Sequence, residues 1–197
     1  MFVLYLGLIG LIFFTLGAWV LGMWLRKHPS RKNAERSSRI VHFLFFVCLV
    51  TPGLMIIFYP GLTQLDGLVG LAPLPLQPFF RVVGFILALP GLYLMGVSSK
   101  LLRSIGNGLN AFRLTKNIVQ SKIYSYTRNP MSLGYYFWML GLGFVAGSRF
   151  AMIVTLLGFI PAHIFFLKYF EELELELRFG EPYKEYKGKV PFLIPRL

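Results

Sequence analysis

The chain has 197 residues, 56% of them hydrophobic, and a mean hydropathy of +0.64. Its apolar residues come in long blocks, which is typical of membrane spans and excludes an ordinary water-soluble domain. The formal net charge is +12, but the basic residues lie in short loops between apolar blocks, where they meet anionic lipid headgroups. We therefore expect membrane lipids, and no nucleic acid, as partners.

Five apolar blocks predict an all-α integral membrane fold in which one domain covers residues 1–197. The predicted spans are residues 2–25, 41–59, 79–97, 132–147 and 150–168. The first block is long, uniformly apolar and not preceded by basic residues, so it is expected to be a retained span and not a signal peptide. Residues 1–97 then hold three spans, and residues 98–197 hold a loop, a helical hairpin and a tail.

The charges of the loops predict the orientation of the chain. Residues 26–39 and residues 98–130 each contain six Lys or Arg, whereas residues 60–78 contain a single charge, Asp66. The positive-inside rule places both basic loops and the C-terminus in the cytoplasm and the N-terminus outside. With four prolines, residues 60–78 are predicted to be an irregular external linker.

Cysteine and histidine usage gives no sign of a metal site. The single cysteine, Cys48, excludes an intrachain disulfide and a cysteine-based zinc cluster. His163 lies in the fifth span, two residues after Pro161, and has no second ligand nearby in that span. We predict that its role is a hydrogen bond that stabilises the proline kink.

The last two spans are predicted to form a tight hairpin. Only Gly147, Ser148 and Arg149 separate them. Asn129-Pro130 is a favourable helix start, because Asn can cap free N–H groups and Pro at the first position loses no hydrogen bond. Arg128 is therefore expected at the membrane surface, beside a positive helix end.

Acidic residues gather after the fifth span, where six of the eight lie between Glu171 and Glu185. Glu174 and Arg178 have the spacing of an i,i+4 pair on a solvated helix. Glu171 and Glu172, in contrast, lie close to hydrocarbon, where a carboxylate requires a cationic or hydroxyl-rich partner. A sulfonium nucleoside supplies both kinds of group.

Taken in order, these C-terminal motifs resemble the isoprenylcysteine carboxyl methyltransferase family and the related phospholipid methyltransferases. The resemblance covers about 80 residues and is carried by Ile118-Val119, Tyr124, Arg128-Asn129-Pro130, Glu171-Glu172, Phe179-Gly180, Tyr183, Tyr186, Val190-Pro191 and Pro195. Each motif is short, and the specificity lies in their order.

The resemblance implies an S-adenosylmethionine-dependent membrane methyltransferase that transfers a methyl group to a lipophilic small molecule or lipid at the cytoplasmic face. It implies Arg128 and Glu172 as catalytic residues, with Glu172 as a base for an amine acceptor. The cofactor-binding residues that it implies are Lys116, Asn117, Ile118, Val119, Tyr124, Asn129, Pro130, Met131, Ser132 and Glu171.

Three positions depart from the family pattern. Ser132 replaces a usual Tyr, and Lys122 replaces a usual Gly. Leu167 stands where the eukaryotic enzymes carry a substrate-binding Arg, with Lys168 next to it. Since a Leu cannot offer a bidentate fork to a carboxylate, the expected acceptor is an amine-bearing or other small membrane lipid and not a prenylcysteine carboxylate.

Two other classes of function are compatible with parts of this pattern. A membrane sterol or steroid reductase would bind NADPH, but the double carboxylate Glu171-Glu172 would repel its 2′-phosphate. A non-catalytic membrane transport protein could use His163 and Glu171 but leaves the order of the motifs unexplained. Binding of S-adenosylmethionine, NADPH or neither separates the three classes.

Overall fold

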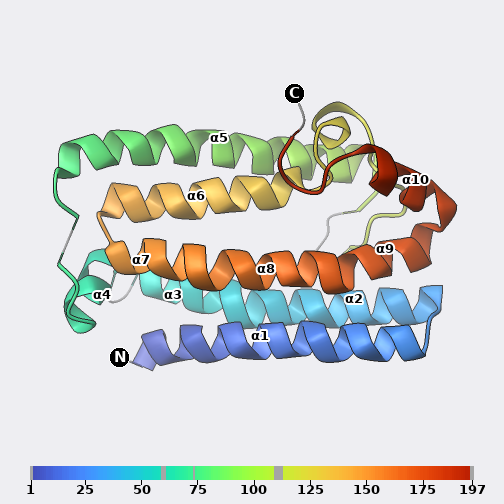
Figure 1. Ribbon diagram of the computed structural model, residues 1–197, viewed down its shortest axis with the longest axis horizontal. Helices are drawn as coiled ribbons and strands as arrows, with labels where there is room; N and C mark the ends of the chain where they lie inside the picture. Colours follow the sequence, from blue (N-terminus) through green and yellow to red (C-terminus); the bar gives the residue numbers. More distant parts are fainter. Residues whose placement is uncertain (1, 59–60, 73, 109–112, 196–197) are drawn as a thin grey trace.

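The computed structural model describes residues 2–58, 61–72, 74–108 and 113–195, and all of its regular elements are helices. Long helical rods lie side by side and alternate in direction (Figure 1). Their bounds are α1 Phe2–Lys27, α2 Arg31–Phe45, η1 Phe46–Val50, α3 Thr51–Phe58, α4 Leu62–Leu68, α5 Gln77–Ser104, η2 Lys122–Ser125, α6 Pro130–Ala146, α7 Arg149–Ile153, η3 Val154–Phe159, α8 Ile160–Phe166, η4 Leu167–Glu171, α9 Glu172–Phe179 and α10 Glu181–Lys189.

Four helical stretches among the described residues are long and apolar enough to cross a membrane. They are Leu4–Lys27, Arg31–Phe58, Gln77–Ser104 and Arg149–Phe179. The predicted fourth span corresponds to α6, which has 17 residues and is therefore shorter than the other four. It runs alongside α5 and antiparallel to the rod formed by α7 to α9 (Figure 1).

The observed helices extend well beyond the predicted spans of residues 41–59, 79–97 and 150–168. The second rod begins at Arg31, because the hydroxyl of Ser30 accepts a hydrogen bond from the backbone N–H of Asn33 at 3.1 Å. The last rod continues to Phe179. Charged residues mark the point where the chain leaves the hydrocarbon core of the membrane. Most of them are good helix formers, so the helix continues beyond that point. Glu171 consequently lies within a continuous rod.

The prediction of an irregular linker over residues 60–78 is wrong for its first part, which forms α4. Asp66 in α4 is buried and accepts hydrogen bonds from the backbone N–H groups of Arg149 (3.2 Å) and Phe150 (2.7 Å). This carboxylate thus caps the N-terminus of α7 from outside the helix, where the helix dipole favours a negative charge. Residues 59–60 and 73 lie outside the described part of the chain.

The predicted hairpin between α6 and α7 is present. Gly147 ends α6 with a φ of 70°, a conformation that suits glycine. The hydroxyl of Ser148 then accepts a hydrogen bond from the backbone N–H of Ala151 at 3.1 Å and caps α7. The two residues between the helices, Gly147 and Ser148, are therefore enough to reverse the chain.

The elements η1 and η3 are short π-helical turns, which are wider than an α-helix, and each comes shortly before a proline, Pro52 and Pro161 respectively. A proline has no N–H to donate and its ring collides with the carbonyl of the preceding turn, so a locally wider helix accommodates it. The third wide turn, η4, contains no proline. Wide turns of this kind occur often at functional sites.

Glycines let α5 and α6 approach each other closely. A Cβ atom on Gly84 would lie 2.7 Å from the carbonyl oxygen of Gly141, and one on Gly91 would lie 2.7 Å from that of Gly134. The two glycines of each helix are seven residues apart, so both pairs lie on one seam of the helix pair. Close backbone approach of this kind is a common way to pack helices in a membrane.

We expect Gly141→Ala to lower the free energy of unfolding by about 1–3 kcal/mol, because the added methyl group collides with the backbone of Gly84. Gly96→Ala on α5 is the matched control, since nothing lies within 4 Å of its added Cβ. It should be neutral or stabilising by about 0.5–1 kcal/mol through helix propensity. Thermal unfolding in detergent micelles measures both, and equal stability of the two variants would contradict close packing along this seam.

Candidate active site

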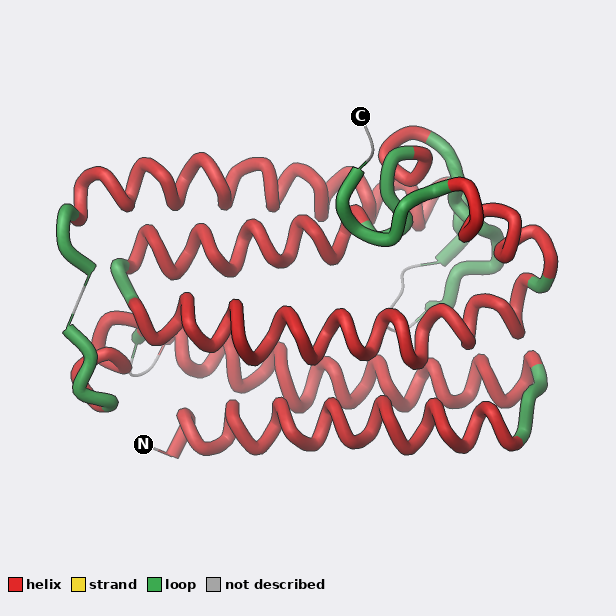
Figure 2. Tube along the Cα trace, in the orientation of Figure 1, coloured by secondary structure: helices red, strands yellow, loops and turns green. Residues whose placement is uncertain are grey.

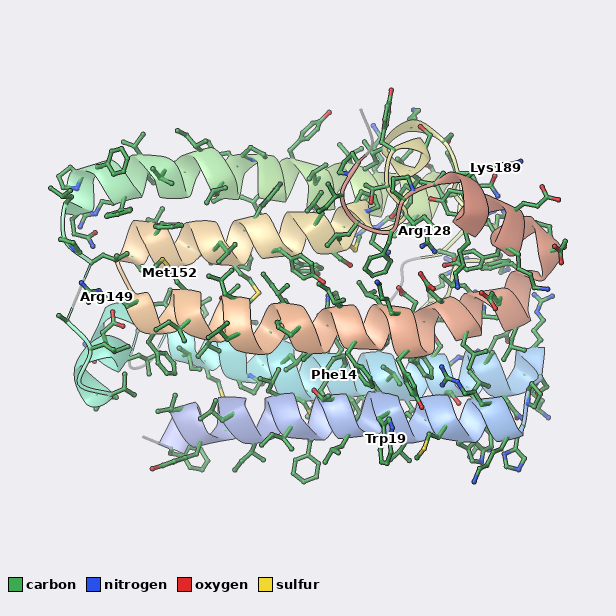
Figure 3. All side chains as sticks on the ribbon, viewed as in Figure 1. Phe14, Trp19, Arg128, Arg149, Met152 and Lys189 are labelled. Atoms are coloured by element: carbon green, nitrogen blue, oxygen red, sulfur yellow. The ribbon has the colours of Figure 1, made fainter. Side chains whose placement is uncertain are left out.

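A cavity of about 280 Å³ lies at the end of the bundle where the loop after α5, the start of α6 and the last helices meet. Loops and α10 gather at this end, whereas the opposite end holds α4 and the turn between α6 and α7 (Figure 2). Arg128 and Arg149 lie at these two opposite ends (Figure 3). Segments far apart in the sequence therefore enclose the cavity.

Most of the site residues implied by the motifs line this cavity. The residues in its wall are Asn117, Ile118, Val119, Tyr124, Arg128, Asn129, Met131, Ser132 and Glu171. Three others do not line it: Lys116 is exposed, Pro130 is buried as the first residue of α6, and Glu172 lies beside the cavity in an ion pair. The structure thus brings together segments that are separate in the sequence.

The loop that carries Asn117 is fastened to the end of α5. The backbone N–H groups of Lys116 and Asn117 donate to the carbonyl oxygen of Gly106 at 2.7 and 3.2 Å. The side-chain amide of Asn117 donates to the carbonyl of Ile105 at 3.1 Å. These bonds fix the backbone of the loop where it borders the cavity.

A buried ion pair holds the same loop from the other side. Arg178 forms a 2.6 Å ion pair with Glu174 and also donates to the carbonyl oxygen of Thr115. Both charged side chains are almost fully buried, so the prediction of a solvated surface pair is wrong. Removing one member of such a pair typically costs about 3–5 kcal/mol. Leucines alternate with the acids from Leu173 to Leu177, and this pattern could have indicated a helix buried on more than one face.

The tail after α10 returns to the start of α6. The backbone N–H of Arg128 donates to the carbonyl of Pro191 at 3.0 Å, and the hydroxyl of Thr127 donates to that of Leu193 at 2.9 Å. The side-chain amide of Asn129 donates to the carbonyl of Phe192 at 2.9 Å. The helix begins at Pro130 as predicted, but the side chain of Asn129 binds the tail and does not cap the helix.

Beside the cavity, two basic and two acidic side chains alternate. Glu172 forms ion pairs with Arg128 at 2.8 Å and with Lys187 at 2.7 Å, and Lys187 also contacts Glu176 at 2.9 Å. Burial disfavours the charge of Lys187, but its hydrogen bonds to the two carboxylates outweigh this effect and raise its pKa. Both carboxylate oxygens of Glu172 are thereby engaged with cations.

Three tyrosines join the tail helix to the rest of the site. The hydroxyl of Tyr186 donates to the carbonyl of Tyr124 at 2.7 Å, and the rings of Tyr183 and Tyr186 pack edge to face at 6.2 Å. Burial raises the pKa of all three hydroxyls far above the usual range. They therefore remain neutral and serve as hydrogen-bonding groups at physiological pH.

Glu171 differs from the other acidic residues around the cavity. It lies in η4 and lines the cavity, yet it makes no hydrogen bond or ion pair with any residue that the structure describes. A carboxylate at such a position can bind hydroxyl groups or a positive charge. Leu167, also in η4, lines the cavity too, whereas the ammonium of Lys168 lies over the ring of Phe192 at 4.9 Å.

Sequence reasoning missed the roles of two histidines in the cavity wall. His163 does make a hydrogen bond, but its partner lies in another helix: its Nδ1 lies 3.0 Å from the hydroxyl of Tyr136 in α6. His42 from α2 reaches the same cavity. Both histidines lie in apolar stretches of the sequence, and no local motif indicates that they line the same cavity.

Comparison with known proteins supports the resemblance that the motifs indicate. The family model described as phospholipid methyltransferase matches residues 79–182, just over half of the chain. The protein-S-isoprenylcysteine O-methyltransferase of Schizosaccharomyces pombe is 35% identical over 80 residues, which are 40% of this chain and 33% of that protein. The methanethiol S-methyltransferase of Crocosphaera subtropica is 35% identical over 74 residues, 36% of this chain and 27% of that protein.

The matched segments thus cover about a third or less of the length of these relatives. The family match itself runs from the start of α5 into α10 and includes the loop, the hairpin and the wide turn that enclose the cavity. The ordered motifs, the helical bundle and the family match agree, and the chain therefore belongs to the phospholipid methyltransferase family of membrane methyltransferases.

Proposed function

We propose that the protein is an S-adenosylmethionine-dependent methyltransferase that transfers a methyl group to a lipophilic acceptor at the cytoplasmic face of a membrane. The family match and the two methyltransferase relatives support the reaction class and disfavour an NADPH-dependent reductase. The observation that carries the proposal is Glu171, an acidic side chain in the cavity wall with no partner among the described residues.

The residues around the cavity fit a sulfonium nucleoside. Glu171 can accept from ribose hydroxyls or face the positive charge, and the amides of Asn117 and Asn129 offer donors and acceptors. Val119 and Met131 give apolar surface for a ring. In this assignment Ile118, Tyr124 and Ser132 complete the wall, while Lys116 and Pro130 act through the backbone, by fixing the loop and by starting α6.

The protein's own contribution to the reaction is positioning. S-adenosylmethionine supplies an activated methyl group, so the residues around it have to align the acceptor and exclude water. Arg128 lines the cavity, and Glu172 holds it in place through the 2.8 Å ion pair. Because both oxygens of Glu172 contact cations, we assign it the role of orienting Arg128 in preference to that of a base.

The cavity wall favours an acceptor without a carboxylate. Leu167 presents an apolar surface, and Lys168 lies against Phe192, so neither offers a bidentate clamp. We propose an amine-bearing or other small membrane lipid as the acceptor, in preference to a prenylcysteine carboxylate.

We further propose that α6 is a fifth crossing, with the N-terminus outside and the C-terminus in the cytoplasm. The reversal at residues 28–30 and the described parts of the loop after α5, residues 105–108 and 113–129, lie at the same end of the bundle as α10, and α4 lies at the other end (Figure 1). The basic loops therefore share one end with the cavity, as the positive-inside rule requires of a cytoplasmic face.

Glu171→Ala should weaken the binding of S-adenosylhomocysteine by about 1.5–3 kcal/mol, the value of a charge-assisted hydrogen bond, which corresponds to roughly ten- to a hundredfold in Kd. Glu181→Ala is the matched control, because Glu181 is exposed and pairs only with Lys184 among the described residues. Calorimetry on the detergent-solubilised protein measures both. Equal affinity of a folded Glu171→Ala protein and the wild type would remove Glu171 from the site.

The topology proposal predicts that a reporter fused at Gln64 is external and that one fused after the last residue is cytoplasmic. Paired alkaline phosphatase and fluorescent protein fusions at each position provide the measurement. A fluorescent cytoplasmic reporter at Gln64 would contradict the five-crossing arrangement, because α4 would then share a side with the basic loops.

The acceptor proposal predicts that labelled S-adenosylmethionine transfers its methyl group to a component of a total membrane lipid extract, and more efficiently than to farnesylcysteine. Chromatography and mass spectrometry of the labelled product identify the acceptor. Efficient methylation of farnesylcysteine with inert lipids would show that Lys168 or Arg128 replaces the missing Arg.

A further inference from the structure

His163 is a buried polar side chain inside an aromatic box. It is 5% exposed, and its ring stacks on Phe159 and Phe166 at centroid distances of 5.5 and 5.6 Å. The ring of Phe45 lies 5.4 Å away on a third side. A polar group in such surroundings is costly unless it has a partner or a function.

Only one ring nitrogen of His163 has a hydrogen-bond partner among the described residues. Nδ1 lies 3.0 Å from the hydroxyl of Tyr136, and Nε2 makes no hydrogen bond within residues 2–58, 61–72, 74–108 and 113–195. The residue lines the same cavity as Glu171. A histidine held at one nitrogen, with the other available, has the arrangement of a general base and its orienting group.

A second, apolar cavity of about 220 Å³ lies on the far side of this aromatic box, toward the α4 end of the bundle. Phe45 and Tyr135 line both cavities, and Phe159, which stacks on His163, lines the apolar one. Leu142 and Val154 belong to its wall as well. The two cavities thus share Phe45 and Tyr135 in their walls, and Phe159 brings His163 next to a space suited to a hydrocarbon chain.

We propose that His163 is a catalytic residue that takes the proton of a neutral S–H or N–H nucleophile whose apolar body lies in the apolar cavity. This proposal rests on the proposed methyl transfer and deepens it. It names the acceptor as a thiol or amine on an alkyl chain. Tyr136 is the positioning residue, because its hydroxyl fixes the ring through Nδ1.

The sulfur or nitrogen of the acceptor forms a bond to the methyl carbon while the bond from that carbon to the donor's sulfonium sulfur breaks, and its electron pair stays on that sulfur. Nε2 accepts the proton that the acceptor loses, and Nδ1–H donates to the oxygen of Tyr136 in this tautomer. His163 later releases the proton to water through the cavity.

Single-turnover methylation of dodecanethiol and of dodecylamine, measured in parallel from low to high pH, tests the proposal. At least one should react in the wild type, and His163→Gln should slow it by about a hundredfold or more, the usual contribution of a positioned base. The affinity for S-adenosylhomocysteine, measured by calorimetry, should not change. His28→Gln is the matched control, because His28 is exposed and, among the described residues, its ring forms a hydrogen bond only with the carbonyl of Trp24.

The pH profile separates a base from a structural role. The wild-type rate should rise with pH and level off once the base is neutral, and this inflection should vanish in His163→Gln. Besides its partner Tyr136, the other titratable side chains around His163 are those of the cavity wall: His42, Arg103, Tyr124, Arg128, Tyr135, Glu171, Tyr183 and Tyr186. An inflection at low pH that persists in His163→Gln would belong to one of these groups and would overturn the proposal, since the thiol and the alkylammonium themselves ionise only at high pH.

Two further variants cover the case in which His163→Gln does not fold. Tyr136→Phe keeps the imidazole but removes its orienting bond, and should slow the reaction about tenfold, the value of one neutral hydrogen bond. Val154→Phe narrows the apolar cavity and should raise the KM of dodecanethiol but not that of ethanethiol. Unchanged kinetics in both would overturn the proposal.

The outcomes for the wild type separate this inference from the proposed function. If the protein binds S-adenosylhomocysteine and methylates carboxylates while thiols and amines are inert, the role of His163 is refuted and the methyltransferase assignment stands. If the protein binds no S-adenosylhomocysteine and methylates none of these compounds, both are refuted.

Discussion

The cost of burying charge governs the part of the molecule that encloses the cavity. Arg128, Lys187 and Arg178 each contact a carboxylate, so that every one of these cations is compensated within the protein. In surroundings of low polarity such pairs contribute less to stability than to a single fixed arrangement, since breaking any of them leaves a charge unpaired. The carboxylate of Glu171 stands outside this set of pairs, and its requirement for a partner is what gives the cavity its chemical character.

The rigid frame around these charges comes from small residues and from wide helical turns. The glycines of α5 and α6 allow the two backbones to touch along one seam. This contact fixes the position of α6 against α5, and with it the positions of Asn129 and Ser132 in the cavity wall. Leu167 and Glu171 both line the cavity, because residues four apart lie on the same face of the rod. Backbone geometry, more than side-chain choice, thus decides which groups converge.

The sequence predicted the helical class, the hairpin and the family, because these depend on hydropathy and on short motifs that act locally. It predicted most of the cavity wall through the order of the motifs. It did not predict the extent of the rods, since charged residues end the hydrocarbon and not the helix. It also missed Asp66 as the cap of α7, the burial of the Glu174–Arg178 pair and the bond between Tyr136 and His163. Each of these contacts depends on tertiary packing, which periodicity and propensity do not encode.

The tail that follows α10 has a consequence for biosynthesis. Thr127 bonds to Leu193, a partner 66 positions later in the chain, and Asn129 bonds to Phe192. During translation the segment before α6 therefore leaves the ribosome long before the residues that hold it, and the hairpin inserts while the cavity is still open on that side. Because α10 supplies Tyr183 and Tyr186 to the cavity, its wall becomes complete only after this late segment has been synthesised and has packed against the bundle.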